Sequence, residues 1–148
     1  MLLEFYVHDE SLVGGLIDLK RLQNGSDEAF PLCLEKPGLH ESALQSLKTI
    51  EINLVSDPVI ADVHGQFMDD PTPTDVITFQ HGEVFVSTDT AARVSRDHDH
   101  PPSREALLYI VHALLHLNGH HDQIPAERSE MHAIQDSILQ KIWPFPES

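Results

Sequence analysis

The sequence predicts an α+β domain with one small, mostly parallel four-stranded sheet, helices packed against it and one buried central helix. Four short segments rich in β-branched and aromatic residues have the composition of strands, and helical patterns separate most of them. A segment at 104–117 is apolar on nearly its whole helical circumference, which is typical of a buried helix. With 148 residues, the chain is expected to form a single domain over 1–148.

The first third of the chain gives a mixed pattern. LLEFYV at 2–7 predicts a short strand, and SLVGGLIDLKRLQ at 11–23 has helical spacing that two adjacent glycines weaken. Between 24 and 41, an Asn-Gly pair, a proline and a Pro-Gly pair interrupt every pattern, so no element is predicted there. SALQSL at 42–47 predicts a short helix.

The middle of the chain has clearer signals. TIEINLVS at 49–56 alternates apolar and polar residues, which predicts a strand with one buried face. DPVIADVHGQF follows as a predicted helix, with Asp57 as its N-cap and Pro58 in the first helical position. DVITFQ and GEVFVS predict two strands joined by a tight turn at His81-Gly82. TDTAARVS at 88–95 predicts a short helix, and RDHDHPP at 96–102 a solvated polar loop.

Composition restricts the possible partners and location. Nine Lys and Arg residues stand against 24 Asp and Glu, a formal net charge of -15. This counts against a protein that holds nucleic acid through phosphates, unless a local patch or a bound cation compensates. Cys33 is the only cysteine, and the N-terminus lacks the basic region of a signal peptide, so a cytoplasmic protein is expected.

The buried helix carries two histidines. In HALLHLNGHHD, at 112–122, His112 and His116 are four residues apart and so project from one helical face. Ser103 is the expected N-cap, Asn118-Gly119 is expected to end the helix, and the returning chain would bring Asp122 to the same point. Three such ligands would leave a fourth metal position open, as in catalytic zinc sites. The alternative is a pair of hydrogen-bonded core histidines.

The same segment also resembles the zinc-protease motif H-E-x-x-H-x-x-G-x-x-H. In those enzymes a glutamate after the first histidine is the general base, and this chain has Ala113 there. Without that carboxylate, peptide hydrolysis loses its main proton acceptor. A zinc protease is therefore not favoured.

Three ordered motifs resemble the YbeY family of metal-dependent endoribonucleases. The family's H-G-x-L-H-L-x-G-Y-D-H corresponds to the histidine segment at 112–122, its P-T-D-V-L-S-F to PTDVITF at 73–79, and its G-D-I-V-I-S to GEVFVS at 82–87. The resemblance runs from about Ile50 to Leu139, and the first 49 residues add little to it.

The resemblance implies a single-strand-specific endoribonuclease acting in rRNA maturation and ribosome quality control. It implies one divalent ion per chain, zinc or else nickel or another ion, bound by His112, His116 and Asp122. The family usually has histidine at the third position, and His121 and His120 are rival ligands. No catalytic acid or base is predicted, and RNA is the expected partner.

Two departures from the family bear on activity. Met68, preceded by Phe67, stands where the family usually has arginine, and His64 stands at an asparagine position. The arginines nearest in sequence to the expected cleft are Arg93, Arg96 and Arg104. The alternative function is therefore a metal-stabilised ribosome-assembly or regulatory protein that binds a ribosomal protein or another protein without cleaving RNA.

Three further features have simpler interpretations. The PTD sequence at 73–75 predicts a turn in which Asp75 bonds locally, or a lining of the metal cleft, or both. His64 is expected at the surface or cleft rim and not as a ligand. The last helix has an apolar stripe that predicts core packing, formed by Met131, Ile134, Ile138 and Ile142.

Overall fold

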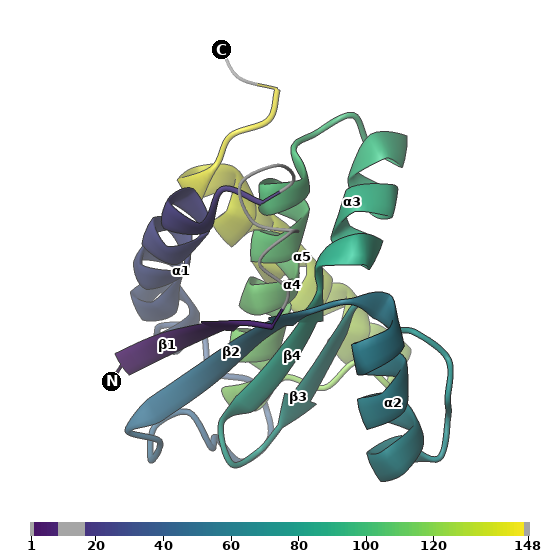
Figure 1. Cartoon of the computed structure of the whole chain (residues 1–148). Coiled ribbons are helices and arrows are strands. Elements are labelled where there is room, and N and C mark those ends of the chain that lie inside the picture. The colour runs from purple at the N-terminus through teal and green to yellow at the C-terminus, as the bar shows by residue number, and fades with distance from the viewer. Residues whose placement is uncertain (1, 9–16, 147–148) are drawn as a thin grey trace.

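The computed structural model describes residues 2–8 and 17–146 of the chain. Within them the strands β1 (Leu2–Val7), β2 (Thr49–Val55), β3 (Val76–Phe79) and β4 (Glu83–Ser87) form one sheet in the order β1-β2-β4-β3. The pairs β1–β2 and β2–β4 are parallel, and β3 runs antiparallel to β4. The predicted small, mostly parallel sheet is therefore confirmed (Figure 1).

Helices cover both faces of this sheet. They are α1 (Leu19–Leu34), α2 (Asp57–Met68), α3 (Thr88–Asp97), α4 (Pro102–Leu117) and α5 (Pro125–Ile142). The main core joins β2 and β4 to α1, α4 and α5, whereas α2 packs through Ile60 on the opposite side of the sheet, against Val55 and Ile77. No helix among the described residues is both long and apolar enough to cross a bilayer.

Helix α4 lies at the centre, in contact with α1, α3 and α5 (Figure 1). After its first residue, only Leu108, His112 and His116 are not buried. These three are spaced four apart and therefore form one partly exposed stripe on an otherwise enclosed helix. The expected buried central helix is present, and both histidines project from its open face.

Both predicted N-caps on these helices are wrong by one or two positions. Helix α4 begins at Pro102 after Pro101, and the Ser103 hydroxyl instead accepts a hydrogen bond from the Asp18 backbone N–H at 2.8 Å. Helix α2 begins at Asp57 itself, with Ser56 as N-cap. The Asp57 carboxylate binds side chains of β4 and α3, so it is not available to cap its own helix.

The N-terminal third differs most from the sequence prediction. Helix α1 continues through Gly25 and Pro31, where no element was expected, and residues 11–16 of the helical segment predicted at 11–23 lie outside the described part of the chain. A Cβ on Gly25 would lie 2.9 Å from a methyl group of Leu107, so glycine permits the close approach of α1 to α4.

The short helix predicted at 42–47 is wrong. The structure has a turn there, because the backbone N–H groups of Ala43 and Leu44 donate to the carbonyl of Leu117 at the end of α4.

Candidate metal centre and cleft

The turn after α4 depends on glycine. Gly119 has a φ of +93°, and a Cβ there would lie 2.4 Å from the carbonyl oxygen of His40. The neighbouring segment is held against the turn, because Gly38 and His40 donate their N–H groups to the carbonyls of Asn118 and Gly119. The predicted helix end at Asn118-Gly119 is confirmed, and the tight turn directs the chain back toward the histidine face.

Both helix histidines are oriented through Nδ1. The Nδ1–H of His112 donates to Gln135 Oε1 at 2.8 Å, and that of His116 donates to the carbonyl of His120 at 3.0 Å. A hydrogen bond at one ring nitrogen fixes the neutral tautomer and leaves the Nε2 lone pair to act as a ligand. The two imidazoles are thus held as protein metal ligands usually are.

Asp122 returns to this face, as predicted. Its Oδ2 lies 3.6 Å from His112 Nε2, and its side chain is 45% exposed. In the described part of the chain, no three His, Cys, Asp or Glu side chains are grouped tightly enough to hold a metal ion. Two nitrogen donors and a carboxylate oxygen match the donor set of zinc, but their convergence on one point stays a prediction.

The rival ligands have other partners. His120 is buried, and its Nε2–H donates to the carbonyl of Lys36 at 2.6 Å. His121 stacks on His40 with ring centroids 3.7 Å apart, and its pKa is lowered by burial and by the nearby His40 and His116 rings. His40 in turn donates to Glu127 at 2.6 Å. His121 also lies beside His116, with ring centroids 5.5 Å apart, so the choice between Asp122 and His121 as the third ligand stays a prediction.

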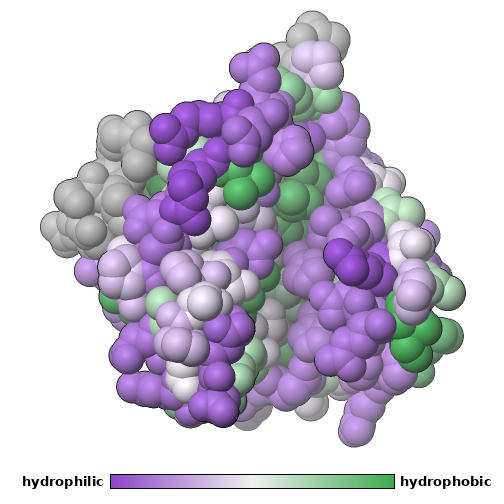
Figure 2. Space-filling view, turned by 90° about the vertical axis from the view of Figure 1, so that its right-hand side faces the viewer, coloured by the Kyte–Doolittle hydropathy of each residue, from purple (hydrophilic) through white to green (hydrophobic). Residues whose placement is uncertain are grey.

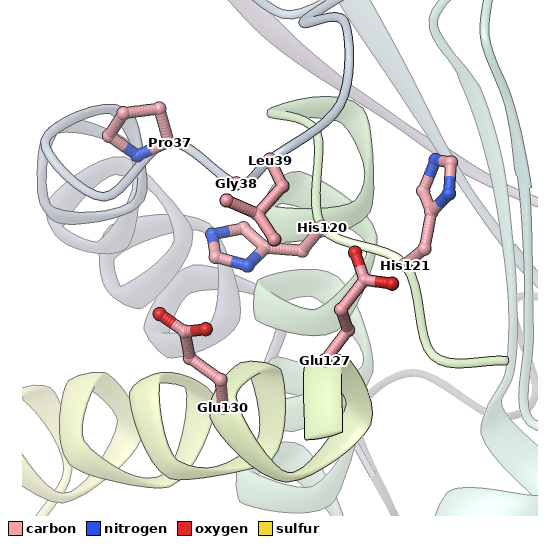
Figure 3. A pocket seen from close by; sticks show the side chains of 7 residues that line it. All are labelled: Pro37, Gly38, Leu39, His120, His121, Glu127 and Glu130. Atoms are coloured by element: carbon pink, nitrogen blue, oxygen red, sulfur yellow. The ribbon is translucent and has the colours of Figure 1, made fainter. Parts of the chain in front are cut away.

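Figure 3 shows that His120 and His121 leave the chain in opposite directions around a small pocket. The pocket has a volume of about 30 Å³, room for about one water molecule. We therefore interpret this pocket as a small packing gap between the turn and α5 and not as a substrate site.

A larger cleft opens beside His112. It has a volume of about 370 Å³ and lies between α3, α4, α5 and the start of β3. The face seen in Figure 2 is hollowed between ridges that are largely hydrophilic, with apolar residues deeper in the hollow. The lining includes the ionisable residues Asp75, Glu105, Tyr109, His112, Asp122, Arg128 and His132.

Both interpretations of the PTD sequence hold. Asp75 Oδ1 accepts the N–H of Val76 at 2.8 Å, a local turn contact, and the residue also lines the cleft. His64 hydrogen-bonds the carbonyl of Thr72 and does not line this cleft, in agreement with its predicted surface role. Met68, where the family has arginine, is 48% exposed at the end of α2.

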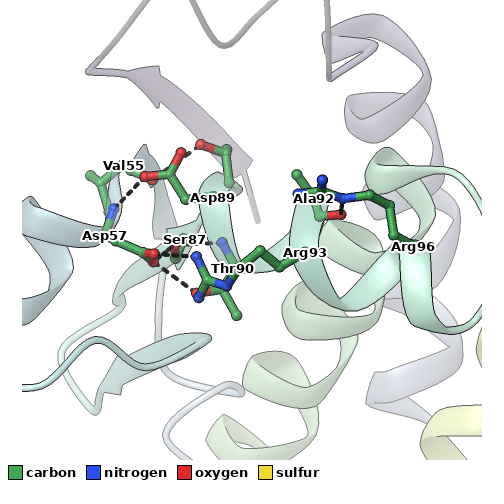
Figure 4. Close-up of polar contacts among 9 residues, drawn as sticks. Val55, Asp57, Ser87, Asp89, Thr90, Ala92, Arg93 and Arg96 are labelled. Atoms are coloured by element: carbon green, nitrogen blue, oxygen red, sulfur yellow. Dashed lines mark hydrogen bonds and ion pairs between the residues drawn. The ribbon is translucent and has the colours of Figure 1, made fainter.

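The three arginines named from the sequence are already engaged. Arg93 pairs with the Asp57 carboxylate, to which Ser87 and Thr90 also donate, and Arg96 donates to its own helix (Figure 4). Arg104 is buried and donates to the carbonyl of Trp143. None of them is a free cation facing the cleft.

Glu105 is a buried carboxylate at the back of the cleft. His100, expected in a solvated loop, instead has a 6% exposed side chain and donates to Glu105 at 2.7 Å. Burial and the Glu105 carboxylate raise the pKa of Tyr109 well above its ordinary value, so its phenol stays neutral. Glu105 and Tyr109 thus give the cleft wall one buried acceptor and one neutral hydroxyl.

Three residues of α5 were missed in the sequence. Arg128, His132 and Gln135 all line the cleft, at spacings of four and three that place them on one helical face. That polar stripe was visible in the sequence beside the apolar one. The apolar stripe itself is confirmed, since Met131 and Ile138 are buried and Ile134 and Ile142 pack against the core.

Two oriented imidazoles and a carboxylate beside a cleft, on an α+β domain, are typical of a hydrolase site that takes a metal ion. Comparison with known proteins supports a hydrolase that acts on RNA. The sequence model of the family described as Endoribonuclease YbeY matches residues 16–143. The chain therefore belongs to the YbeY family.

Individual relatives support this assignment. The chain is 31% identical over 119 residues to Endoribonuclease YbeY of Salinibacter ruber, covering 70% of this chain and 76% of the relative. It is 32% identical over 102 residues to the protein of the same description from Acholeplasma laidlawii, covering 64% and 74%. A solution structure from Thermotoga maritima has the same fold, with a TM-score of 0.64, 22% identity and coverage of 95% and 89%.

Proposed function

We propose that the protein is a metal-dependent endoribonuclease that cleaves single-stranded RNA during rRNA maturation and ribosome quality control. The observation that carries this proposal is the pair of oriented imidazoles, His112 and His116, with the Asp122 carboxylate beside the first of them. The site opens onto a cleft large enough for part of an extended strand. Membership of the YbeY family supports RNA as the substrate.

His112, His116 and Asp122 would hold one divalent ion, for which we expect zinc, with nickel or another ion as alternatives. When bound, the ion supplies Lewis-acid chemistry: activation of water and neutralisation of charge on the phosphodiester. The residues around it orient the site. Gln135 and the His120 carbonyl hold the two rings, and buried α4 walls one side of the cleft.

The setting we propose is the cytoplasm. Cys33 is a free, buried thiol, which suits a reducing compartment. Ribosomal or ribosome-associated proteins are further proposed partners, because rRNA in the cell is assembled with them.

One observation favours the alternative of a metal-stabilised binding protein without nuclease activity. The cleft lining includes the carboxylates of Asp75, Glu105 and Asp122, which repel phosphate, against the single guanidinium of Arg128 among the described residues. Such a cleft would suit a basic protein segment better than RNA if no cation occupied it.

Cleavage by protein purified without an affinity tag separates the two functions. Metal-free protein is supplied with zinc, nickel or manganese and given single-stranded and duplex oligoribonucleotides. We expect the wild type to cleave the single strand. His116→Ala should lose both the cleavage activity and the bound metal. His81→Ala, a control at the exposed hairpin turn, should retain both the activity and the metal. A folded, metal-loaded wild type that cuts neither RNA would favour the binding protein.

A further inference from the structure

We propose that Arg128 binds a backbone phosphate of the RNA strand that occupies the cleft. The inference rests on the proposed function, and it assigns the substrate contact to a residue outside the motifs through which the sequence resembles its family. Arg128 lies in α5, after the turn that carries Asp122, and lines the same cleft as His112 and Asp122.

The Arg128 side chain is exposed and unengaged. Its backbone N–H donates to the Ile124 carbonyl at 2.9 Å as the first bond of the helix, but its guanidinium has no hydrogen bond or ion pair to any of the residues described. A cation in the first turns of a helix opposes the helix dipole. Helix stability therefore does not account for arginine at this position.

The other arginines near the cleft are held by the protein. Arg93 is paired with Asp57 and also donates to Thr90 at 3.0 Å (Figure 4). Arg104 is buried, and Arg96 donates to the carbonyl of Ala92. Among the described residues that line the cleft, Arg128 is thus the arginine that can bind a phosphate without breaking a contact inside the protein.

The negative charge of the cleft requires a cationic side chain if an RNA strand is to bind there. The chain carries a net charge of -15, and Asp75 and Glu105 add negative charge to the lining on the α4 and β3 sides. A phosphate strand entering there needs a counter-charge on the opposite wall, and guanidinium matches phosphate oxygens in a bidentate geometry.

Arg128 is also placed to couple binding to the metal ligands. It is seven residues before Gln135 and on the same face of α5, and Gln135 holds His112. A phosphate on Arg128 would therefore lie along the wall that orients the first imidazole. A phosphate bound to Arg128 would therefore set the position of the RNA strand relative to the proposed metal ion.

Equilibrium binding of a fluorescent single-stranded oligoribonucleotide over a range of salt tests the proposal. Arg128→Ala is expected to bind about tenfold more weakly, and the slope of log affinity against log salt should fall in magnitude by about 0.7, the value for one phosphate contact on a single strand. Arg128→Lys should retain most of the slope. Arg96→Ala, which removes the same charge outside the cleft, should leave both quantities unchanged.

An Arg128→Ala protein whose affinity and salt slope equal those of Arg96→Ala overturns the proposal, as does a wild type that binds no RNA. Cleavage measured in parallel separates this inference from the nuclease function. If wild type cuts RNA and Arg128→Ala binds it normally, only the inference fails. If wild type binds RNA through Arg128 but never cuts it with metal supplied, only the nuclease function fails.

Discussion

Replacing Gln135 by leucine should weaken zinc binding without removing a ligand. Gln135 is 7% exposed, and its Oε1 accepts the Nδ1–H of His112 at 2.8 Å. Leucine has similar size but no acceptor, so the imidazole loses the contact that fixes its tautomer and direction. Loss of such a partner typically costs 10–100-fold in metal affinity, which is about 1.4–2.8 kcal/mol. The metal-free protein should lose only about 1 kcal/mol of unfolding free energy, because the His112 side chain is 23% exposed.

Competition with a chromogenic chelator measures the zinc affinity, and urea unfolding in excess chelator measures the stability of the metal-free state. Gln135→Glu is the matched control, since its carboxylate still accepts from Nδ1 and should preserve or strengthen zinc binding. If Gln135→Leu bound zinc within about twofold of wild type, His112 would not be a ligand oriented by this residue.

The remaining predictions concern the third ligand, the turn and the acid stability. Asp122→Ala should weaken zinc binding more than Gln135→Leu does, whereas His121→Ala should leave it nearly unchanged; the reverse order in the chelator assay would make His121 the ligand. Gly119→Ala should lower the unfolding free energy by at least about 2 kcal/mol, because alanine is strained at a φ of +93° and its Cβ would meet a carbonyl oxygen. Urea unfolding checks this, and a loss below about 0.5 kcal/mol would contradict it. Burial alone raises the pKa of Asp57, but hydrogen bonds from two hydroxyls and a guanidinium outweigh it and hold that pKa below its ordinary value of 3.8. Its stabilising contribution is therefore present above pH 3.8 and lost as pH falls below it, so the stability gap between wild type and Asp57→Asn should be widest near neutral pH and close in acid.

The elements predicted correctly are those whose pattern is local. Alternation along β2 and the all-round apolar surface of α4 each follow from neighbours within a few residues. The part of helix α1 after residue 23 was missed because Gly25 and Pro31 lower helix propensity, while packing against α4 stabilises the helix despite them. The turn at 42–47 was missed because its N–H groups bind a carbonyl at the end of α4, which is distant in sequence.

The same division applies to the site. The four-residue spacing placed His112 and His116 on one face, and Gly119 predicted the return of Asp122. The contact of His112 with Gln135 joins residues 23 apart in sequence, and that of His40 with His121 joins different parts of the chain. No local pattern encodes such contacts, so the orientation of the rings and the engagement of His121 required the structure.

The proposed function requires a divalent ion on His112, His116 and Asp122 for the cleavage of single-stranded RNA. The most direct measurement is the cleavage rate of a single-stranded oligoribonucleotide by metal-free protein as zinc is added in known equivalents. The rate should rise to a plateau at one equivalent of zinc per chain in wild type and stay at background in His116→Ala. A rate that is independent of added metal, or equal in wild type and His116→Ala, would contradict it.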